Sequence, residues 1–323
     1  MKLRQKLRTQ EHFGSLIGGS LPMQEVYDQM KKAAVVDIPL LLEGETGSGK
    51  DLAAQTIHQL SDRHHGPYIP INLGALPTDL VAGELFGHEK GAFTGAVGLR
   101  KGRFEEARNG SIFLDEIEAV DEKIQVTLLR LIENRKFYRL GGKRRMTTNA
   151  RLLAASNQSL EKLVHNGSFR EDLYYRLNIF PITMPPLRDH KEDLPLLISH
   201  CVLQAMRMMK KQITEIDQEC ITILQDYSWP GNVRELKNVM QQSVLMCDGP
   251  TILPEHLPAR FHDSVVSTVP VVSFKIGTPL EKIEQAMILR TLELTENNRT
   301  EAAKLLGISR RALYNRLTKY NIE

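Results

Sequence analysis

A glycine-rich loop near the N-terminus has the residue types needed to hold phosphate groups. It directly follows a short apolar run and opens an amphipathic stretch. Its glycines let backbone N–H groups converge on phosphate oxygens, and the start of a helix adds positive potential there. Lys50 is placed to reach the outer phosphates of a nucleotide. The predicted phosphate-binding residues are Gly44, Glu45, Thr46, Gly47, Ser48, Gly49, Lys50 and Asp51.

Acidic residues decide how such a site would hold magnesium. Asp51 stands where the general phosphate-loop motif has a Ser or Thr that binds Mg²⁺. A second apolar run ends in the pair Asp115-Glu116. In parallel sheets, carboxylates at the C-terminal end of a buried strand lie beside the phosphate loop. We therefore expect Asp115 to hold Mg²⁺, directly or through water, and Glu116 to polarise the water that attacks the γ-phosphate.

The segment Gly91–Ala96 reads as a turn with an apolar tip. Glycines near both of its ends permit sharp bends, and Phe93 lies between them. Such a residue either inserts into the surface of a partner protein or is buried inside an ordinary loop. The residues alone leave both interpretations open.

The C-terminal segment has the pattern of a helix-turn-helix. Ala303 is small where two helices would cross, Gly307 allows the turn, and Ser309 can cap the second helix. Residues 299–319 hold six basic side chains and one acidic side chain, a local charge of +5 against +3 for the whole chain. This distribution favours nucleic acid, although a basic hairpin that only dimerises is the alternative. The predicted DNA-binding residues are Ser309, Arg310, Arg311, Tyr314, Asn315, Arg316, Thr318 and Lys319.

The helix that precedes this hairpin has an apolar stripe. The stripe consists of Leu280, Ile283, Met287, Leu289 and Leu292. A lone hairpin cannot bury so many side chains, so we expect a dimer surface. Packing within the unit is the other interpretation.

Five short apolar runs, separated by longer amphipathic stretches, must position the phosphate site. They span residues 38–42, 68–72, 111–115, 151–156 and 179–182. Unbroken apolar strands between helices indicate a parallel sheet that is covered on both faces. From about residue 187 to residue 261 the sequence has only helical periodicity, which predicts a small helical domain. Residues 262–279 are expected to be a linker, or an extended strand against a neighbour.

Length and composition exclude several classes of protein. The 323 residues include 41% hydrophobic and 25% charged residues, which excludes a disordered or fibrous chain. No stretch approaches the roughly 20 apolar residues of a transmembrane helix. The three cysteines are odd in number and form no CxxC pair, so we expect reduced thiols in a cytoplasmic protein.

Three motifs make the chain similar to a known family. Residues 84–96 contain GAFTGA, residues 169–177 read FREDLYYRL, and residues 229–236 read WPGNVREL. These motifs resemble the AAA+ ATPase domain of bacterial enhancer-binding proteins, the NtrC-type activators of sigma-54 RNA polymerase. The similarity covers about residues 13–261, and a Fis-type helix-turn-helix follows.

The resemblance implies roles for further residues. Asn72 would be a switch that holds Glu116, although the following Leu73-Gly74 departs from the Cys-Ala of relatives. Arg170 and Arg176 would be arginine fingers that reach the nucleotide of a neighbouring subunit. Asn157 resembles the sensor I residue, and Arg234 resembles sensor II. The segment expected to contact sigma-54 consists of Gly91, Ala92, Phe93, Thr94, Gly95 and Ala96. The loop 137–149 is either a second pore loop or a solvated basic hairpin.

The expected fold is α/β: an AAA+ P-loop parallel sheet with an α-helical lid, plus an all-α helix-turn-helix domain. The boundaries are a tail at 1–12, the α/β part at 13–186, the lid at 187–261, the linker at 262–279 and the DNA-binding domain at 280–323. The expected function is ATP- and Mg²⁺-dependent activation of the sigma-54 holoenzyme from enhancer DNA by a dimer that assembles into a hexameric ring. The rivals are an AAA+ machine with another target, such as a replication initiator, and a repressor with a vestigial ATPase.

The N-terminal regulatory domain of relatives has no counterpart in this chain. Either the activator works without one, or the chain is a fragment. Control would come from a separate regulatory protein, from the expression level, or from a domain outside this chain.

Overall fold

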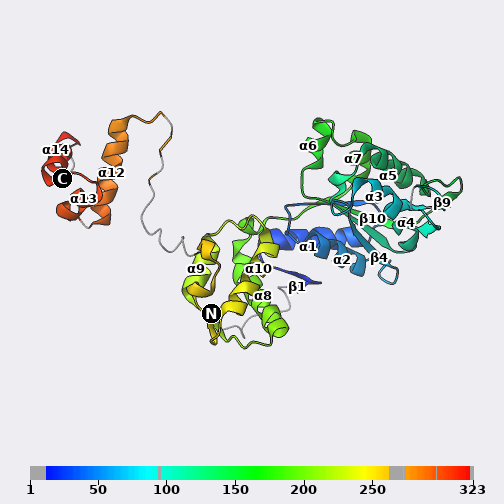
Figure 1. The fold of residues 1–323 in the computed structure, drawn as a ribbon, viewed down its shortest axis with the longest axis horizontal. Coiled ribbons are helices and arrows are strands. Elements are labelled where there is room, and N and C mark those ends of the chain that lie inside the picture. The colour runs from blue at the N-terminus through cyan, green and yellow to red at the C-terminus, as the bar shows by residue number, and fades with distance from the viewer. Residues whose placement is uncertain are drawn as a thin grey trace. The chain divides into compact units, whose positions relative to one another are not determined.

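The computed structural model describes residues 12–93, 96–261, 272, 274–275, 277–295 and 297–320. Thr94, Gly95, the expected tail up to residue 11 and most of the expected linker therefore lie outside the described residues. The chain divides into two compact units, Met1–Pro258 and Ala259–Glu323 (Figure 1).

The first unit is built on a five-stranded sheet. Its strands are β3 (Leu40–Glu43), β4 (Tyr68–Asn72), β7 (Ser111–Asp115), β10 (Arg151–Ser156) and β11 (Pro181–Thr183). They lie in the order β11-β3-β10-β7-β4, and every neighbouring pair is parallel. The predicted parallel sheet is confirmed. Strands β3 and β11 are shorter than their apolar runs. Strand β3 begins just after Pro39 and β11 begins at Pro181, and proline lacks the N–H of a ladder hydrogen bond.

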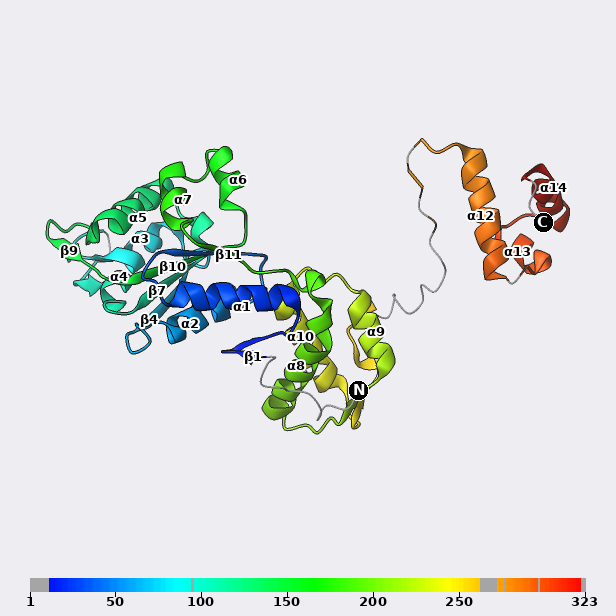
Figure 2. The ribbon, with the colours of Figure 1, turned by 180° about the vertical axis from the view of Figure 1, so that it is seen from behind.

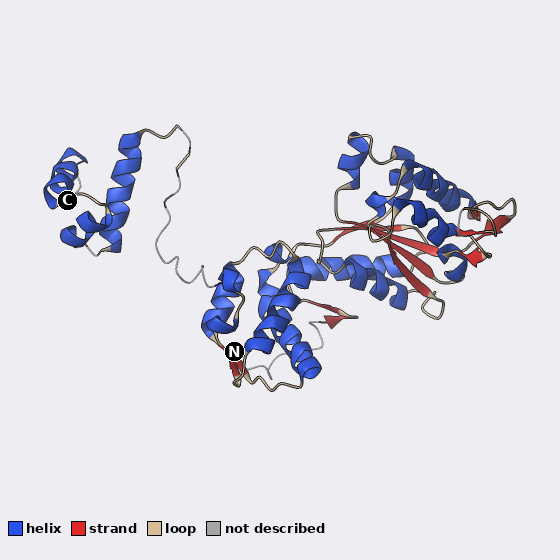
Figure 3. Cartoon of the chain, in the orientation of Figure 1, coloured by secondary structure: helices blue, strands red, loops and turns tan. Residues whose placement is uncertain are grey.

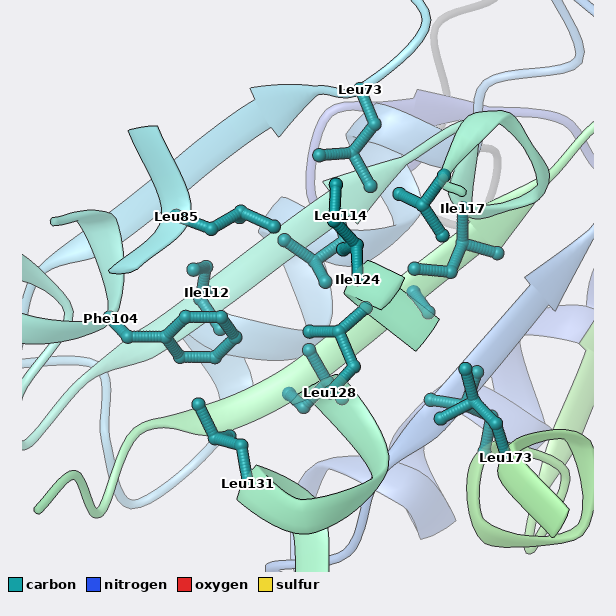
Figure 4. Close-up of a cluster of buried hydrophobic side chains, with 14 of the residues drawn as sticks. Leu73, Leu85, Phe104, Ile112, Leu114, Ile117, Ile124, Leu128, Leu131 and Leu173 are labelled. Atoms are coloured by element: carbon teal, nitrogen blue, oxygen red, sulfur yellow. The ribbon is translucent and has the colours of Figure 1, made fainter. Parts of the chain in front are cut away.

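Side chains alternate between the two faces of this sheet. Leu40 and Leu42 of β3 pack with α1 (Leu21–Ala34) and α2 (Lys50–Leu60) on one face. Leu41 points to the opposite face, where it joins the cluster drawn in Figure 4. That cluster is completed by side chains of α3 (Thr78–Phe86), α4 (Arg103–Glu106), α5 (Glu122–Asn134) and α7 (Glu171–Leu177). Helices therefore cover both faces, as the unbroken apolar strands predict (Figure 2).

Short elements connect these layers. They are β1 (His12–Phe13), β2 (Leu16–Ile17), β5 (Gly87–His88), β6 (Arg100–Lys101), η2 (Ile117–Ala119), β8 (Lys136–Tyr138), β9 (Arg145–Thr147) and α6 (Leu160–His165). Strands β8 and β9 form an antiparallel hairpin. Among the described residues, no helix is long and apolar enough to cross a membrane.

A mainly helical lid completes the first unit (Figure 3). Its elements are η3 (Leu187–Asp189), η4 (Lys191–Asp193), α8 (Leu194–Met209), β12 (Glu215–Ile216), α9 (Gln218–Asp226), α10 (Asn232–Met246), β13 (Thr251–Ile252) and η5 (Pro254–His256). Helix α8 buries an apolar face that contains Leu194, Leu197, Ile198 and Cys201. The three cysteines are buried free thiols in this lid.

The second unit begins with η6 (Ala259–Phe261), and its described residues also form the helices α12 (Leu280–Leu294), α13 (Arg299–Leu305) and α14 (Arg310–Tyr320). Gly307 lies between α13 and α14 with a φ of 66°, as a left-handed turn requires. The Ser309 hydroxyl accepts a hydrogen bond from the Ala312 N–H at 3.1 Å. The predicted helix-turn-helix geometry is confirmed at both residues.

The apolar stripe predicted on α12 is partly buried within the unit and partly exposed. Leu292 packs inside the unit, together with Ile288, which the stripe omitted. Met287 and Leu289 remain 41% and 39% exposed. Leu280 is also exposed. Packing within the unit therefore accounts for Leu292. Ile283 is half-buried, and Leu280, Met287 and Leu289 remain available at the surface.

Candidate nucleotide site and partner surfaces

The phosphate loop joins β3 to α2, as predicted. Gly47 and Gly49 adopt φ values of 80° and 95°, which residues with a Cβ atom rarely adopt. At Gly47, an added Cβ would collide with the Gly231 carbonyl of the lid. The loop opens onto a small cleft lined by Thr46, Gly47, Gly49, Lys50, Asp51, Asp115, Glu116, Asn157 and Arg234. The fold thus brings together predicted residues that are far apart in the sequence.

Lys50 is held against the loop that it follows. Its side chain is 7% exposed, and its ammonium group donates to the carbonyl oxygens of Gly44 and Glu45. Burial lowers the pKa of Lys50, and the nearby charge of Asp115 opposes that shift. The ammonium group is therefore already placed beside the loop to which phosphates would bind.

Asn72 contacts both acidic residues at the end of β7. Its amide nitrogen lies 3.2 Å from Glu116 Oε1 and 3.4 Å from Asp115 Oδ2. Its amide oxygen accepts the Ala75 N–H at 2.9 Å, which fixes the orientation of the side chain. An added Cβ at Gly74 would collide with the Glu116 carboxylate, so the glycine leaves room for this contact. Burial raises the pKa of Asp115.

The Glu45 carboxylate is directed to the lid. Arg188 donates to both Glu45 oxygens at 2.7 and 2.9 Å, and Asn232 donates to one of them at 3.1 Å. The Arg188 guanidinium holds the pKa of Glu45 below its usual value. Asn232 also donates to the Thr46 carbonyl and accepts the Leu187 N–H. The lid is therefore hydrogen-bonded to the phosphate loop itself.

Three residues of the site were missed by sequence reasoning. Arg188 and Asn232 form this lid contact, and only Asn232 had a signal, as part of the WPGN turn. Glu118 accepts the Asn157 N–H at 3.1 Å and so ties the expected sensor I residue to the turn after β7. The second oxygen of Glu118 is buried and has no hydrogen-bond partner among the residues that the structure describes. Nothing in the sequence pattern distinguishes Glu118 from a surface glutamate.

Arg170 and Arg176 lie outside the cleft. Arg170 precedes α7 as its N-cap residue, and it pairs with Asp172 at 2.8 Å and Glu122 at 3.3 Å. Arg176 pairs with Glu133 at 3.1 Å, and its side chain is more than half exposed. Neither lines the cleft of its own chain among the described residues.

The tip residue Phe93 is exposed rather than buried in its loop. It is 43% exposed, and its ring lies against His88 with centroids 5.0 Å apart. The Gly91 N–H donates to the Ala96 carbonyl at 2.9 Å, which closes the base of the turn. An apolar ring held at the surface is suited to contact a partner.

The basic loop 137–149 is the β8–β9 hairpin, and it braces the Phe93 turn. Leu140 exchanges backbone hydrogen bonds with Gly87 and Glu89. Arg139 donates to Glu89 at 2.9 Å and to both oxygens of Glu105. The hairpin is thus both basic and joined to the segment expected to contact sigma-54.

The predicted DNA-binding residues of the second unit mostly lie at its surface. Those classed as exposed are Ser309, Arg310, Arg311, Tyr314, Asn315, Thr318 and Lys319. Arg316 is half-buried and pairs with Glu284 of α12, and Lys319 pairs with Glu281 at 2.6 Å. The local charge of +5 omits these two glutamates, because they lie on the preceding helix α12, outside the counted segment.

The donor set of the cleft suits a magnesium ion that is held mainly by a nucleotide. Among residues 12–93 and the other described segments, no group of three or more His, Cys, Asp or Glu side chains could hold a metal. Mg²⁺ is commonly bound by one or two carboxylates together with phosphates and water. Asp115, next to the phosphate loop, meets that requirement.

Three family models match successive parts of the chain. The sigma-54 interaction domain matches residues 16–183, an AAA+ ATPase lid domain matches residues 188–271, and a Fis-family bacterial regulatory protein domain matches residues 279–320.

Characterised proteins and solved structures agree with these matches. The chain is 41% identical to regulatory protein AtoC of Escherichia coli, over 99% of this chain and 71% of AtoC. It is 42% identical to nitrogen fixation protein VnfA of Azotobacter vinelandii, of which it spans 62%. The crystal structure of NtrX from Brucella abortus in complex with ATP matches with a TM-score of 0.70 at 28% identity, over 95% of this chain and 69% of NtrX. The chain therefore belongs to the sigma-54-dependent transcription activators, as an AAA+ ATPase with a Fis-type DNA-binding domain.

Proposed function

We propose that this chain binds enhancer DNA, assembles into a ring, and uses ATP hydrolysis to press the segment 91–96 against sigma-54. The observation that carries this proposal is the exposed Phe93 on a closed, braced turn. That turn is linked to the cleft through the chain itself. Asn72, which contacts Glu116, and the Phe93 turn are joined by α3. A change at the γ-phosphate that releases Glu116 from Asn72 would thus act on the segment leading to the turn.

The residues of the cleft divide the chemistry of hydrolysis. Lys50 neutralises the outer phosphates, and Glu116 orients and polarises the attacking water. Asn72 restrains Glu116 until the neighbouring subunit and the nucleotide are in place. Arg234 and Asn157 face the nucleotide from the lid side and the sheet side of the cleft. Asp115 would hold Mg²⁺, which supplies positive charge to the leaving phosphate oxygens.

The arginine fingers require a second subunit. Arg170 and Arg176 line no part of their own cleft, so each would complete the site of a neighbour. A hollow of about 450 Å³ beside the cleft is lined by Asp51, Asn72 and Asp115 among other residues. Its acidic side chains suit an incoming guanidinium group. A ring, as in the hexamers that the family resemblance implies, would form such sites at every interface.

The second unit would anchor the ring to DNA. Arg310, Arg311, Tyr314 and Asn315 are exposed on α14 and would read base edges, whereas Arg316 and Lys319 would meet phosphate. The exposed apolar residues of α12 would pair two such units into a dimer.

Promoter opening tests the proposal directly. Purified chain, sigma-54 holoenzyme, promoter DNA carrying an enhancer, and ATP should give open complexes that permanganate footprinting detects. A non-hydrolysable ATP analogue should give none. Equal opening with the analogue would overturn the proposal.

The role of the Phe93 turn needs a separate test. Phe93→Ala should abolish opening and sigma-54 binding, while the ATPase rate stays within about twofold of the parent chain. Leu99→Ala, at an exposed apolar residue just beyond the same turn, is the matched control. Normal opening by Phe93→Ala would assign the sigma-54 contact elsewhere.

A further inference from the structure

A further cavity, which the proposed reaction does not use, lies between α3, α5 and the β8–β9 hairpin. Its volume is about 700 Å³. Pockets of about 300–1,000 Å³ are of the size that binds small or flexible ligands. Buried Phe86, Ile124 and Phe137 form an apolar floor. The nucleotide cleft shares none of its lining residues.

The lining of this cavity is strongly basic. It contains the basic residues Lys123, Arg130, Lys136, Arg139 and Arg145. Its acidic residues are Asp79 and Asp121, which gives a net charge of +3 (5 − 2), as large as that of the whole chain. The hollow is therefore a basic patch in a chain whose overall charge is small.

Most of these cations are not neutralised by the part of the chain that the structure describes. Arg139 is matched by two glutamates outside the lining. Lys123, Arg130 and Lys136 have no carboxylate partner among the described residues. A hollow with several unmatched cations attracts a ligand that carries more than one negative charge.

An aromatic side chain stands among these cations. Tyr138 lines the cavity and is 49% exposed. The Arg145 guanidinium donates to its hydroxyl at 3.3 Å, so the ring lies beside a cation of the lining. A basic groove with an accessible aromatic ring is the combination that binds single-stranded nucleic acid, because phosphates meet the cations and a base stacks on the ring. A hollow of this size admits a few flexible nucleotides and excludes a rigid duplex.

The cavity adjoins the segment that we expect to act on sigma-54. Leu140 and Gly141 line it, and Leu140 is bonded through its backbone to Gly87 and Glu89 at the base of the Phe93 turn. The loop of the same hairpin adds exposed Lys143 and Arg144. A strand bound here would therefore lie beside the Phe93 turn.

We propose that this groove is a second nucleic-acid site, which binds single-stranded DNA exposed when promoter DNA melts. The biological role rests on the proposed function, but the binding itself does not. Lys123, Arg130 and Lys136 contact phosphates, and Tyr138 stacks on a base. The helix-turn-helix unit, by contrast, reads duplex DNA.

Fluorescence anisotropy with a labelled 15-nucleotide oligothymidine tests the groove without ATP or sigma-54. The 323-residue chain carries Arg310→Ala and Arg311→Ala, so that the helix-turn-helix contributes little. Adding Lys123→Ala and Lys136→Ala removes two phosphate contacts. Each contact adds about 0.7 to the slope of log affinity against log salt, so the slope should fall by about 1.4 and affinity at 0.1 M salt by roughly 25-fold. Lys32→Ala with Lys237→Ala removes the same charge from α1 and α10 and should change affinity less than twofold.

The stacking contact has its own matched pair. Tyr138→Phe keeps the ring and should bind as the parent does, whereas Tyr138→Leu should lose at least fivefold in affinity. Unchanged affinity and slope in the lysine pair would overturn the proposal. So would equally tight binding of a polyglutamate peptide, or of duplex DNA that competes for the groove. Promoter opening does not enter this test, so its failure would be separate from a failure of the proposed function.

Discussion

The nucleotide cleft and the helix-turn-helix unit differ in how their functional groups are held. In the cleft, Lys50 and Asn72 are fixed by several hydrogen bonds each, and most of those partners are backbone atoms or motif residues. In the second unit, Arg310 and Arg311 are exposed and extend from one helix. The cleft is therefore prepared for a single ligand geometry, whereas the DNA surface keeps side-chain freedom that it would lose on binding.

The largest expected effect concerns Arg176, which lies outside the cleft of its own chain and is proposed to act in the cleft of a neighbour. Arg176→Ala should lower the ATPase rate by about 10³–10⁵, because the finger stabilises charge on the transferring phosphate. Mixing Arg176→Ala with Lys50→Ala chains should restore part of the activity. In a mixed ring, the intact Lys50 site of an Arg176→Ala chain can receive the intact Arg176 of a neighbouring Lys50→Ala chain. DNA binding by the second unit should not change.

The control is Arg207→Ala, an exposed arginine on the lid helix α8 that should keep the parent rate. If the mixture stays as inactive as each variant alone, Arg176 does not act between subunits. The nucleotide cleft would then need no residue from a neighbouring subunit.

A somewhat smaller effect is expected inside the cleft. Glu116→Gln should lower the ATPase rate by about 10²–10⁴, the usual contribution of a general base. Nucleotide affinity, measured with a fluorescent ADP analogue, should stay within a few-fold of the parent. Glu219→Gln, on an exposed carboxylate at the start of the lid helix α9, should keep the parent rate. A Glu116→Gln chain that hydrolyses ATP normally would remove Glu116 from the mechanism.

The same contrast explains how much could be predicted from the sequence. The sheet, the phosphate loop and the Asp115-Glu116 pair were predicted because each depends on local spacing. Strands β4, β7 and β10 have the bounds of their apolar runs. Such features require no knowledge of which distant segments meet.

Contacts between distant segments could not be predicted. Glu45 meets Arg188 and Asn232 across 143 and 187 residues of sequence. Likewise, the count of basic residues in the second unit ignored Glu281 and Glu284. Both lie on α12, and in the folded unit they pair with Lys319 and Arg316 of α14. Net charge over a segment predicts the kind of partner, but the cations left free depend on the tertiary fold.

The lid contact predicts a moderate loss of stability. Asn232 is fully buried, makes three hydrogen bonds through its side chain, and has a φ of 51°. Asn232→Ala should lower the free energy of unfolding by about 1–3 kcal/mol, because the Leu187 N–H loses its partner. Chemical denaturation measures this loss.

Two variants separate the causes of that loss. Asn232→Gly removes the side chain without the left-handed strain, so it isolates the hydrogen bonds. Asn238→Ala, at an exposed position of the same helix, should change stability by less than about 0.5 kcal/mol. If Asn232→Gly is as stable as the parent, the hydrogen bonds between lid and phosphate loop contribute nothing.

The smallest expected effect concerns the ion pairs of the DNA surface. Glu281→Gln releases Lys319, which then offers its full charge to a phosphate. Affinity for enhancer DNA should rise by up to roughly eightfold at 0.1 M salt, and the salt slope should steepen by about 0.9. Glu293→Gln removes the same charge from α12, but its partner is Arg290 of that helix, so it should have less effect. If both variants raise affinity equally, overall charge governs DNA binding. If Glu281→Gln alone raises affinity, specific ion pairs within the unit occupy the cations of this surface and must break before phosphate binds. In the cleft, by contrast, Lys50 is already in place for its ligand.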